Sequence, residues 1–335
     1  MRSFAIGVDL GGTNLRIAAV EETGCQLELI TGFTDLDRGR ERVMADISSA
    51  IKRLIARFTP SHRLSGVGIG IPGVIDLERG TLCSASNLPG WSDYPVRREL
   101  ERLLGTPVLL ENDANCAALG EKWLGAGKRV ENLCMLTLGT GVGGGFVFSG
   151  KPWHGATGMA GELGHMTVIP DGHPCGCGSR GCLEQYASAV AIRRMALEQL
   201  AKSGRRDLLA LARNPEFGSQ TVFEYAERGE AWAKNVFEIV GSTLGIALAN
   251  LINGLNLPMY VIGGGVSAAW SSFSPAMFRE LEKRSIVFRV SDPSSSQHKS
   301  TIVTRTELGG SAGLLGAARL PMLASRSRAF FSLAV

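Results

Sequence analysis

Residues 4–20 read FAIGVDLGGTNLRIAAV, and in them a glycine-rich turn separates two apolar segments. The first segment, Phe4–Leu10, has the composition of a buried strand. The turn Gly11–Asn14 follows, and a second apolar run, Leu15–Val20, begins directly after it. Two strand-like runs joined by a short glycine turn predict a hairpin.

The same pattern returns in the middle of the chain, where residues 132–148 read NLCMLTLGTGVGGGFVF. We predict a strand over Asn132–Leu138, a turn over Gly139–Gly145 and a returning strand over Phe146–Phe148. Elsewhere, strand-like runs alternate with segments of helical periodicity, which predicts an α/β fold with mixed sheets. The repeated hairpin predicts two similar α/β halves around a cleft, where ligands usually bind.

The size of the chain fits this division into halves. It has 335 residues, of which 44% are hydrophobic, so it is long and apolar enough for two cores. We place a smaller N-terminal domain at residues 1–117 plus 306–335. A larger domain, residues 118–305, carries most of the cysteines.

Charge and hydropathy exclude several classes of protein. The formal net charge is +4, and no basic block is dense enough to indicate nucleic acid binding. No apolar run reaches transmembrane length and no signal-peptide pattern begins the chain, so we expect no membrane partner and a cytoplasmic location. The apolar segment Ala231–Leu255 predicts a long core helix, and long apolar helices favour a homo-oligomer, a dimer or a tetramer.

Three glycine-rich turns, each after an apolar strand, are candidate phosphate sites. Glycine lets backbone N–H groups approach and surround a phosphate, and nearby hydroxyl and amide side chains add donors. Asp9 precedes the first turn and would hold Mg²⁺ through water. The alternative for each turn is an ordinary tight connection, but three in one chain favour a nucleotide such as ATP. The residues assigned to this site are Asp9, Gly11, Gly12, Thr13, Asn14, Thr140, Gly141, Gly264 and Gly265.

Two familiar nucleotide motifs do not apply. Gly139, Gly141 and Gly144 have the spacing of a dinucleotide-binding turn, but that motif must open a helix, and here an apolar strand follows. The chain also has no Gly-Lys-Ser or Gly-Lys-Thr of a P-loop.

One histidine and three closely spaced cysteines predict a metal site: His165, Cys175, Cys177 and Cys182. Four such ligands suit Zn²⁺ and leave no open coordination position, so the metal would be structural. The alternative is a buried histidine beside unrelated thiols. His173 competes only as a substitute for His165, and His154 lacks the spacing.

Three acidic residues are candidates for substrate chemistry. Glu162 and Glu184 bracket the metal ligands, and their carboxylates suit hydrogen bonds to sugar hydroxyls; the alternative is a solvated surface charge. Asp113 follows a strand and opens a helix, where it would either cap the helix or accept a proton from a substrate hydroxyl.

Together these motifs resemble the ROK family of bacterial sugar kinases and repressors over almost the whole chain. The first two glycine turns resemble the phosphate loops of the family, and residues 158–165 with 175–184 resemble its signature and zinc segment. The resemblance implies an actin-like ATPase (ribonuclease H-like) fold whose two domains close over ATP and a sugar. It implies that Asp113 is the base that deprotonates the sugar 6-hydroxyl, and that Gly264 and Gly265 lie by the adenosine. The sugar would be bound by Asn87, Asn112, Asp113, Glu162, His165 and Glu184, with His165 also ligating zinc.

Within the family, residues 87–91 and 182–188 are most similar to the glucokinases. Many members are repressors with an N-terminal helix-turn-helix, whereas this chain begins at the first strand, which favours a kinase. The resemblance therefore implies phosphorylation of glucose to glucose 6-phosphate with ATP, Mg²⁺ and a structural Zn²⁺. Alternatives are a kinase for N-acetylmannosamine, N-acetylglucosamine, mannose, fructose or allose, a non-catalytic sugar-sensing regulator, or an ATPase with a protein partner.

Overall fold

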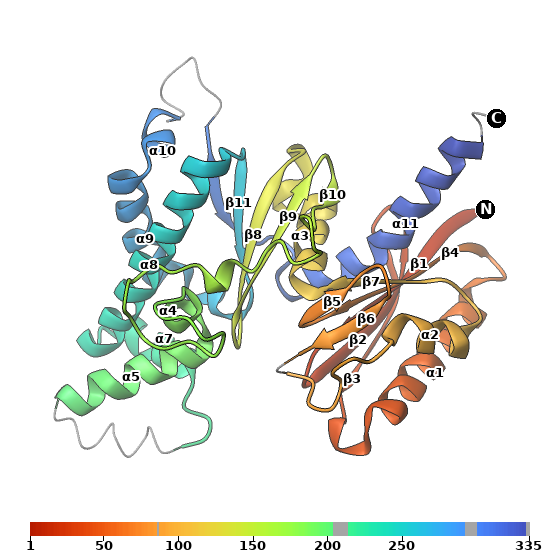
Figure 1. The fold of residues 1–335 in the computed structure, drawn as a ribbon, viewed down its shortest axis with the longest axis horizontal. Helices are drawn as coiled ribbons and strands as arrows, with labels where there is room; N and C mark the ends of the chain where they lie inside the picture. The colour runs from red at the N-terminus through yellow and green to blue at the C-terminus, as the bar shows by residue number, and fades with distance from the viewer. Residues whose placement is uncertain (86, 204–213, 292–299, 333–335) are drawn as a thin grey trace. The chain divides into compact units, whose positions relative to one another are not determined.

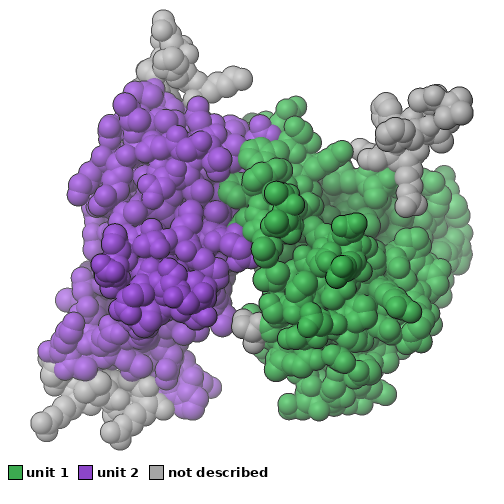
Figure 2. Space-filling model, in the orientation of Figure 1, with its two compact units in different colours: residues 1–131, 145–161, 310–335 green, residues 132–144, 162–309 purple. Residues whose placement is uncertain are grey.

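The computed structural model describes residues 1–85, 87–203, 214–291 and 300–332, and the chain forms two compact units (Figure 2). The first unit comprises Met1–Glu131, Gly145–Gly161 and Gly310–Val335, and the second comprises Asn132–Gly144 and Glu162–Gly309.

These bounds differ from the domain bounds expected from the sequence. The expected boundary at residue 117 falls inside helix α3 (Asp113–Leu124), which belongs entirely to the first unit. Helix α3 stays with that unit because it packs along α11 (Ala312–Ser332), where Gly316 lies directly against the carbonyl of Cys116.

The first unit is built on a five-stranded sheet with the strand order β3-β2-β1-β4-β7 (Figure 1). Strands β1, β2 and β3 form an antiparallel meander, and β4 and β7 extend the sheet parallel to β1. This confirms the hairpin predicted over residues 4–20. The strands are β1 (Arg2–Leu10), β2 (Asn14–Glu21), β3 (Gln26–Phe33), β4 (His62–Ile71) and β7 (Val108–Asn112), and a separate two-stranded sheet pairs β5 (Val74–Asp76) with β6 (Thr81–Ser84).

The two faces of the first sheet are covered in different ways. Phe4, Ile6, Val8 and Leu10 alternate along β1 and join one buried core with apolar side chains of α1 (Arg40–Phe58) and α2 (Val96–Leu104). On the other face, Gly7 of β1 and Gly68 of β4 lie against the backbone of α11, where a Cβ would collide with helix atoms. The absence of side chains at these two positions lets α11 lie directly on the sheet.

The second sheet repeats the order of the first: β10-β9-β8-β11-β12. In each sheet, three strands consecutive in the chain lie side by side in reverse order, and two later strands complete the other edge. This repetition confirms the prediction of two similar α/β halves with mixed sheets. The strands are β8 (Leu133–Leu138), β9 (Val142–Phe148), β10 (Lys151–Pro152), β11 (Met259–Gly263) and β12 (Ile302–Arg305).

One prediction for the second hairpin is wrong. The turn expected over Gly139–Gly145 ends at Gly141, because β9 already begins at Val142. The remaining glycines belong to the strand, and at Gly145 the strand passes close to the carbonyl of Ala114. A larger side chain there would separate β9 from α3.

The helices of the second unit pack around α8 (Ala231–Leu255), whose bounds agree with the sequence prediction. The prediction that no apolar run reaches transmembrane length is wrong for α8, which by length and composition could cross a membrane. However, 67% of its most apolar window is buried inside the protein. At Gly241 its backbone lies against the carbonyl of Phe273 in α9. The other α-helices among the described residues of this unit are α4 (Glu184–Ala187), α5 (Ala189–Ser203), α7 (Ser219–Glu227), α9 (Trp270–Arg284) and α10 (Ile286–Val290).

The C-terminal helix is longer than its sequence predicts. From the sequence alone, residues Ser311–Leu320 predict a helix that stops before Pro321, and the tail from Pro321 shows no clear pattern. Helix α11 instead continues through Pro321 to Ser332. The buried proline lies over Gly66 and Gly68 of β4, so contact with the sheet outweighs the hydrogen bond that a proline omits from a helix. The sequence also predicts a polar loop over Ser291–Ser300, of which residues 292–299 lie outside the described residues.

Candidate active site and metal cluster

Asp113 lies where β7 ends and α3 begins, as the sequence predicts. It is the first residue of α3, and its Oδ1 accepts a hydrogen bond from the N–H of Ala114 at 2.9 Å. Its side chain is half-buried. A carboxylate in the first turn is stabilised by the positive end of the helix dipole, so this position suits an ionised group that must accept a proton.

Asn112 acts as the N-cap of the same helix. Its Oδ1 accepts hydrogen bonds from the N–H groups of Ala114 at 2.9 Å and Asn115 at 3.3 Å. Its Nδ2 donates to the carbonyl of Gly73 at 3.2 Å. The amide of this predicted sugar ligand is therefore already committed to holding the turn that carries Asp113.

The sequence reasoning missed a polar network beside this turn. Glu111 is buried, and its Oε1 accepts from the N–H of Asn112 at 2.9 Å and from Nδ2 of Asn115 at 3.0 Å. Its Oε2 lies 2.6 Å from Nε2 of His154. A carboxylate inside a buried strand requires such partners, which is the signal that the sequence offered.

The first glycine turn brings Asp9 and Arg16 together. The two residues are opposite each other in the hairpin, and their side chains form an ion pair. The Asp9 carboxylate also lies near Gly313, in the first turn of α11. Asp9 was predicted and Arg16 was not, although counting pairs back from the turn would have found it.

The rest of this turn leaves polar groups exposed. Thr13 and Asn14 have exposed side chains, and the carbonyl of Asn14 accepts from the N–H of Gly11 at 2.9 Å. Gly12 lies against the backbone carbonyl of Asn87, so one predicted sugar residue and one predicted phosphate residue are neighbours within the first unit.

The second glycine turn is joined to Glu184 in the second unit. Oε2 of Glu184 accepts from the N–H of Val142 at 3.0 Å. A Cβ at Gly141 would collide with that same oxygen, so only glycine fits here. Thr140 is exposed at the tip of the turn. The sequence analysis assigned Gly141 to nucleotide and Glu184 to sugar, and the structure places them in contact.

The third turn contains Gly264 and Gly265, which follow β11 and are exposed. Gly264 has a φ of 81° and lies against the backbone of Leu138. Both the positive φ and the close approach require glycine at this position. The hydroxyl of Ser267 donates to the carbonyl of Gly264 at 2.7 Å and holds the turn.

The four predicted metal ligands converge in the second unit. One ligand atom from each of His165, Cys175, Cys177 and Cys182 lies within 4.8 Å of the others. Sγ of Cys177 is 3.7 Å from Sγ of Cys182, and Sγ of Cys175 is 3.7 Å from Nδ1 of His165. A tetrahedral zinc with bonds of about 2.3 Å to sulfur and about 2.05 Å to nitrogen requires separations of roughly 3.8 Å and 3.6 Å. The donor set and its spacing therefore fit Zn²⁺.

His165 also lies beside Glu162. Its Nε2 is 3.9 Å from Oε2 of Glu162, and their side chains are 37% and 55% exposed. Because Nδ1 faces the cysteines and Nε2 faces Glu162, the imidazole ring joins the metal cluster to an exposed carboxylate. His173 lies outside the cluster, and its Nδ1 is 2.9 Å from the carbonyl of Pro174.

Comparison with known proteins identifies relatives over nearly the full chain. The model of the ROK family matches residues 5–322. A glucokinase from Halalkalibacterium halodurans is 39% identical over 314 residues, which is 93% of this chain and 92% of that protein.

Two solved structures share the fold. A ROK hexokinase from Thermus thermophilus superposes with a TM-score of 0.79 at 32% identity, covering 98% of this chain and 100% of that chain. A ROK family glucokinase from Streptomyces griseus, solved in complex with glucose and AMPPNP, has a TM-score of 0.75 at 34% identity. That match covers 95% of this chain and 99% of the other.

Proposed function

This chain belongs to the ROK family, and from that premise we propose that it is a glucokinase that transfers the γ-phosphoryl group of ATP to the 6-hydroxyl of glucose. The observation that carries the proposal is the half-buried carboxylate of Asp113 at the start of α3, at a position that suits a base. The similarity to glucokinases over more than nine-tenths of the chain supports glucose as the substrate.

In the proposed reaction Asp113 accepts the proton of the 6-hydroxyl as that oxygen attacks the γ-phosphorus. Phosphoryl transfer asks little of the protein beyond positioning and charge neutralisation. The glycine turns with Thr13, Asn14, Thr140, Gly264 and Gly265 would bind ATP through backbone and side-chain donors. Mg²⁺, when bound with ATP, would neutralise phosphate charge. Asp9 is the carboxylate that would face it through water, and Arg16 fixes the orientation of Asp9.

The sugar would be held by Asn87, Asn112, Glu162, His165 and Glu184. Oε2 of Glu184 accepts a hydrogen bond from the Val142 N–H, which holds the carboxylate in one orientation. This fixed orientation supports Glu184 as a sugar ligand. Asn112 contributes chiefly by holding Asp113, because its own amide is engaged in capping.

We expect the substitution Gly141→Ala to weaken glucose binding. The added methyl would collide with Oε2 of Glu184 and displace the carboxylate from the Val142 N–H. A hydrogen bond to a charged group is worth about 1.5–3 kcal/mol, so we expect the Kd for glucose to rise roughly 10- to 100-fold. Calorimetric titration with glucose in the absence of nucleotide measures this change.

The matched control is Gly139→Ala, which adds the same methyl to the same turn where no atom lies within 4 Å. It should keep the glucose Kd of the unaltered protein. Equal glucose affinity in both variants would remove Glu184 from the proposed sugar site.

We also propose that the cluster of His165 and three cysteines binds one structural Zn²⁺. The ion would hold the segment between Glu162 and Glu184, whose regular structure is one short 3₁₀ helix and isolated bridges. With four protein ligands the ion has no open position for substrate. Its effect on the reaction would therefore be to fix His165 and the flanking glutamates.

The decisive experiment is an assay of ADP release with a panel of hexoses. Fastest turnover with glucose supports the proposal, and faster turnover with N-acetylmannosamine, N-acetylglucosamine, mannose, fructose or allose would reassign the substrate. Sugar binding without ADP release would indicate a regulator, and ADP release that needs no sugar would indicate an ATPase with another partner.

Location and assembly remain predictions. We propose a cytoplasmic enzyme without nucleic acid or membrane partners, because the charge is close to balanced and α8 is largely buried. We propose a homo-oligomer, a dimer or a tetramer. In support, the short helix α10 exposes Ile286 and Val290, which are 62% and 58% exposed.

A further inference from the structure

Glu111 and His154 lie beside the proposed catalytic residue, yet neither takes part in the proposed proton transfer. The Glu111 side chain is 4% exposed and that of His154 is 34% exposed. Their Oε2 and Nε2 atoms are 2.6 Å apart, which is a short, charge-assisted contact. Within the first unit, this pair connects two segments that are 43 residues apart in the chain.

The other oxygen of Glu111 holds the turn that carries Asp113. Oε1 accepts from the N–H of Asn112, the residue before Asp113, and from the side chain of Asn115, two residues after it. The carboxylate of Glu111 therefore fixes the turn on both sides of Asp113. Any movement of this carboxylate would be passed on to the start of α3.

His154 is itself held in place by its own segment. Its carbonyl accepts from the N–H of Ala160 at 3.1 Å, which closes residues 154–160 into a loop. The preceding Trp153 donates its N–H to the carbonyl of Phe146 in β9 at 2.9 Å. The imidazole therefore approaches Glu111 from a backbone that is anchored on both sides.

We propose that His154 is a positioning residue for the phosphoryl transfer: it holds the Glu111 carboxylate, which in turn holds the turn that carries Asp113. This inference rests on the proposed kinase function. Without His154, Oε2 of Glu111 would lose the donor that the structure gives it, and a buried carboxylate short of a donor either shifts or is protonated. Both outcomes would disturb the hydrogen bonds to Asn112 and Asn115.

A metal-binding role does not fit His154. Its Nε2 is engaged by Glu111, and among the described residues the only group suited to a metal contains His165 and the three cysteines. The contact with Glu111 gives His154 a role within the first unit that involves no metal.

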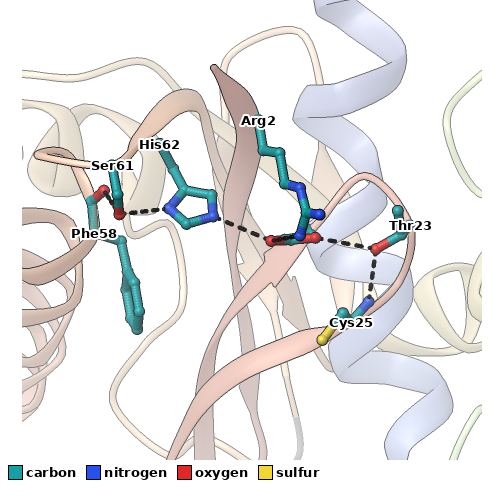
Figure 3. Close-up of polar contacts among 7 residues, drawn as sticks. Arg2, Thr23, Cys25, Phe58, Ser61 and His62 are labelled. Atoms are coloured by element: carbon teal, nitrogen blue, oxygen red, sulfur yellow. Dashed lines mark hydrogen bonds and ion pairs between the residues drawn. The ribbon is translucent and has the colours of Figure 1, made fainter.

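The chain provides a matched control in a second pair of a histidine and a buried glutamate. Figure 3 shows His62, Arg2 and Thr23 converging on one carboxylate, that of Glu21. Nε2 of His62 is 3.1 Å from Oε1 of Glu21, whose side chain is 6% exposed. His62 begins β4, and Glu111 pairs with Gly70 eight residues later, which at about 3.3 Å per residue is roughly 26 Å away. The control pair therefore has similar chemistry far from Asp113.

We expect His154→Ala to lower kcat by up to roughly 100-fold, since a misplacement of about 1 Å can cost that much, while the KM for glucose changes little. His62→Ala should lower the melting temperature but keep kcat. His154→Gln retains an N–H donor and should recover part of the lost rate. All variants are assayed by ADP release, at a temperature where circular dichroism shows each to be folded.

The outcomes separate this inference from the proposed function. If the unaltered protein releases no ADP with any hexose, the proposed function fails. If it is active and His154→Ala keeps the kcat of His62→Ala, the positioning role is wrong and His154 is only structural. A rate loss in His154→Ala that His154→Gln does not reduce at all would also contradict a role through hydrogen bonding.

The pH dependence of stability gives an independent readout. The hydrogen bond to Glu111 raises the pKa of His154, and burial opposes this effect. Burial raises the pKa of the nearby Cys116 thiol, and the carboxylates of Glu111, Asp9 and Asp113 raise it further, so Cys116 stays neutral. Because the folded state holds the His154 proton more tightly, the pair contributes its full stabilisation of the folded protein below the unfolded pKa of about 6.5. This contribution is lost as the pH rises through the raised pKa of the folded state.

The difference in the free energy of unfolding between the unaltered protein and His154→Ala should therefore shrink between pH 6 and pH 9. Urea denaturation across that range measures it. A difference that stays constant or grows with pH would show that the charged pair does not form.

Discussion

Replacing Asp113 with asparagine will lower kcat for glucose phosphorylation by roughly 10²- to 10⁴-fold, the usual contribution of a general base. Asparagine has the same shape and its amide oxygen can still accept from the Ala114 N–H, so the start of α3 should be unchanged. In the proposed mechanism, the variant loses only the capacity to take a proton from the 6-hydroxyl. We therefore expect glucose to bind with nearly its original Kd, as calorimetric titration would measure.

The control for this variant is Asp46→Asn on the exposed surface of α1. Asp46 pairs with Arg42 at 3.2 Å, and surface pairs of this kind contribute little to stability and nothing to chemistry here. The control should retain full activity. Turnover in Asp113→Asn above about a tenth of the original rate would remove Asp113 from the role of base.

Replacing Cys177 with serine will release the proposed zinc and loosen the segment around it. Cys177 is exposed, so its substitution removes a metal ligand without creating a cavity in the core. Structural zinc sites bind with apparent free energies of about 10–16 kcal/mol, comparable to the net stability of a whole domain. We expect the zinc content to fall from about one ion per chain and the melting temperature to fall with it.

Glucose affinity should decrease in the same variant, because His165 and the glutamates at the ends of the segment would lose their fixed positions. Cys25→Ser changes another exposed thiol, in the first unit, and serves as the control. Metal analysis by plasma emission and calorimetric titration with glucose measure the two effects. An active protein with full glucose affinity and no zinc would rule out the structural metal.

The parts of the fold that follow from local patterns were predictable from the sequence. The two predicted hairpins indicated two similar sheets, and the two sheets have the same strand order. Helix α8 has the bounds that its apolar run predicts. The convergence of the four proposed metal ligands was also predictable, because three of them lie within eight residues.

What was missed depends on contacts between distant residues. Pro321 continues α11 because it packs over glycines of β4, a contact that no local rule contains. Glu111 contacts His154, which lies 43 residues later in the chain, and no periodicity in the sequence predicts this contact. In both cases tertiary contacts override a local preference.

The packing of α11 on Gly7 and Gly68 has a consequence for the order of folding. Strand β1 is covered by α11, so the first unit is not complete until α11 has left the ribosome. Most of the second unit is formed by one continuous segment, Glu162–Gly309, which is synthesised before α11. Contacts between distant parts of a chain form slowly, whereas units of a growing chain fold as they emerge. The N-terminal half would thus be the last to mature, although it is made first.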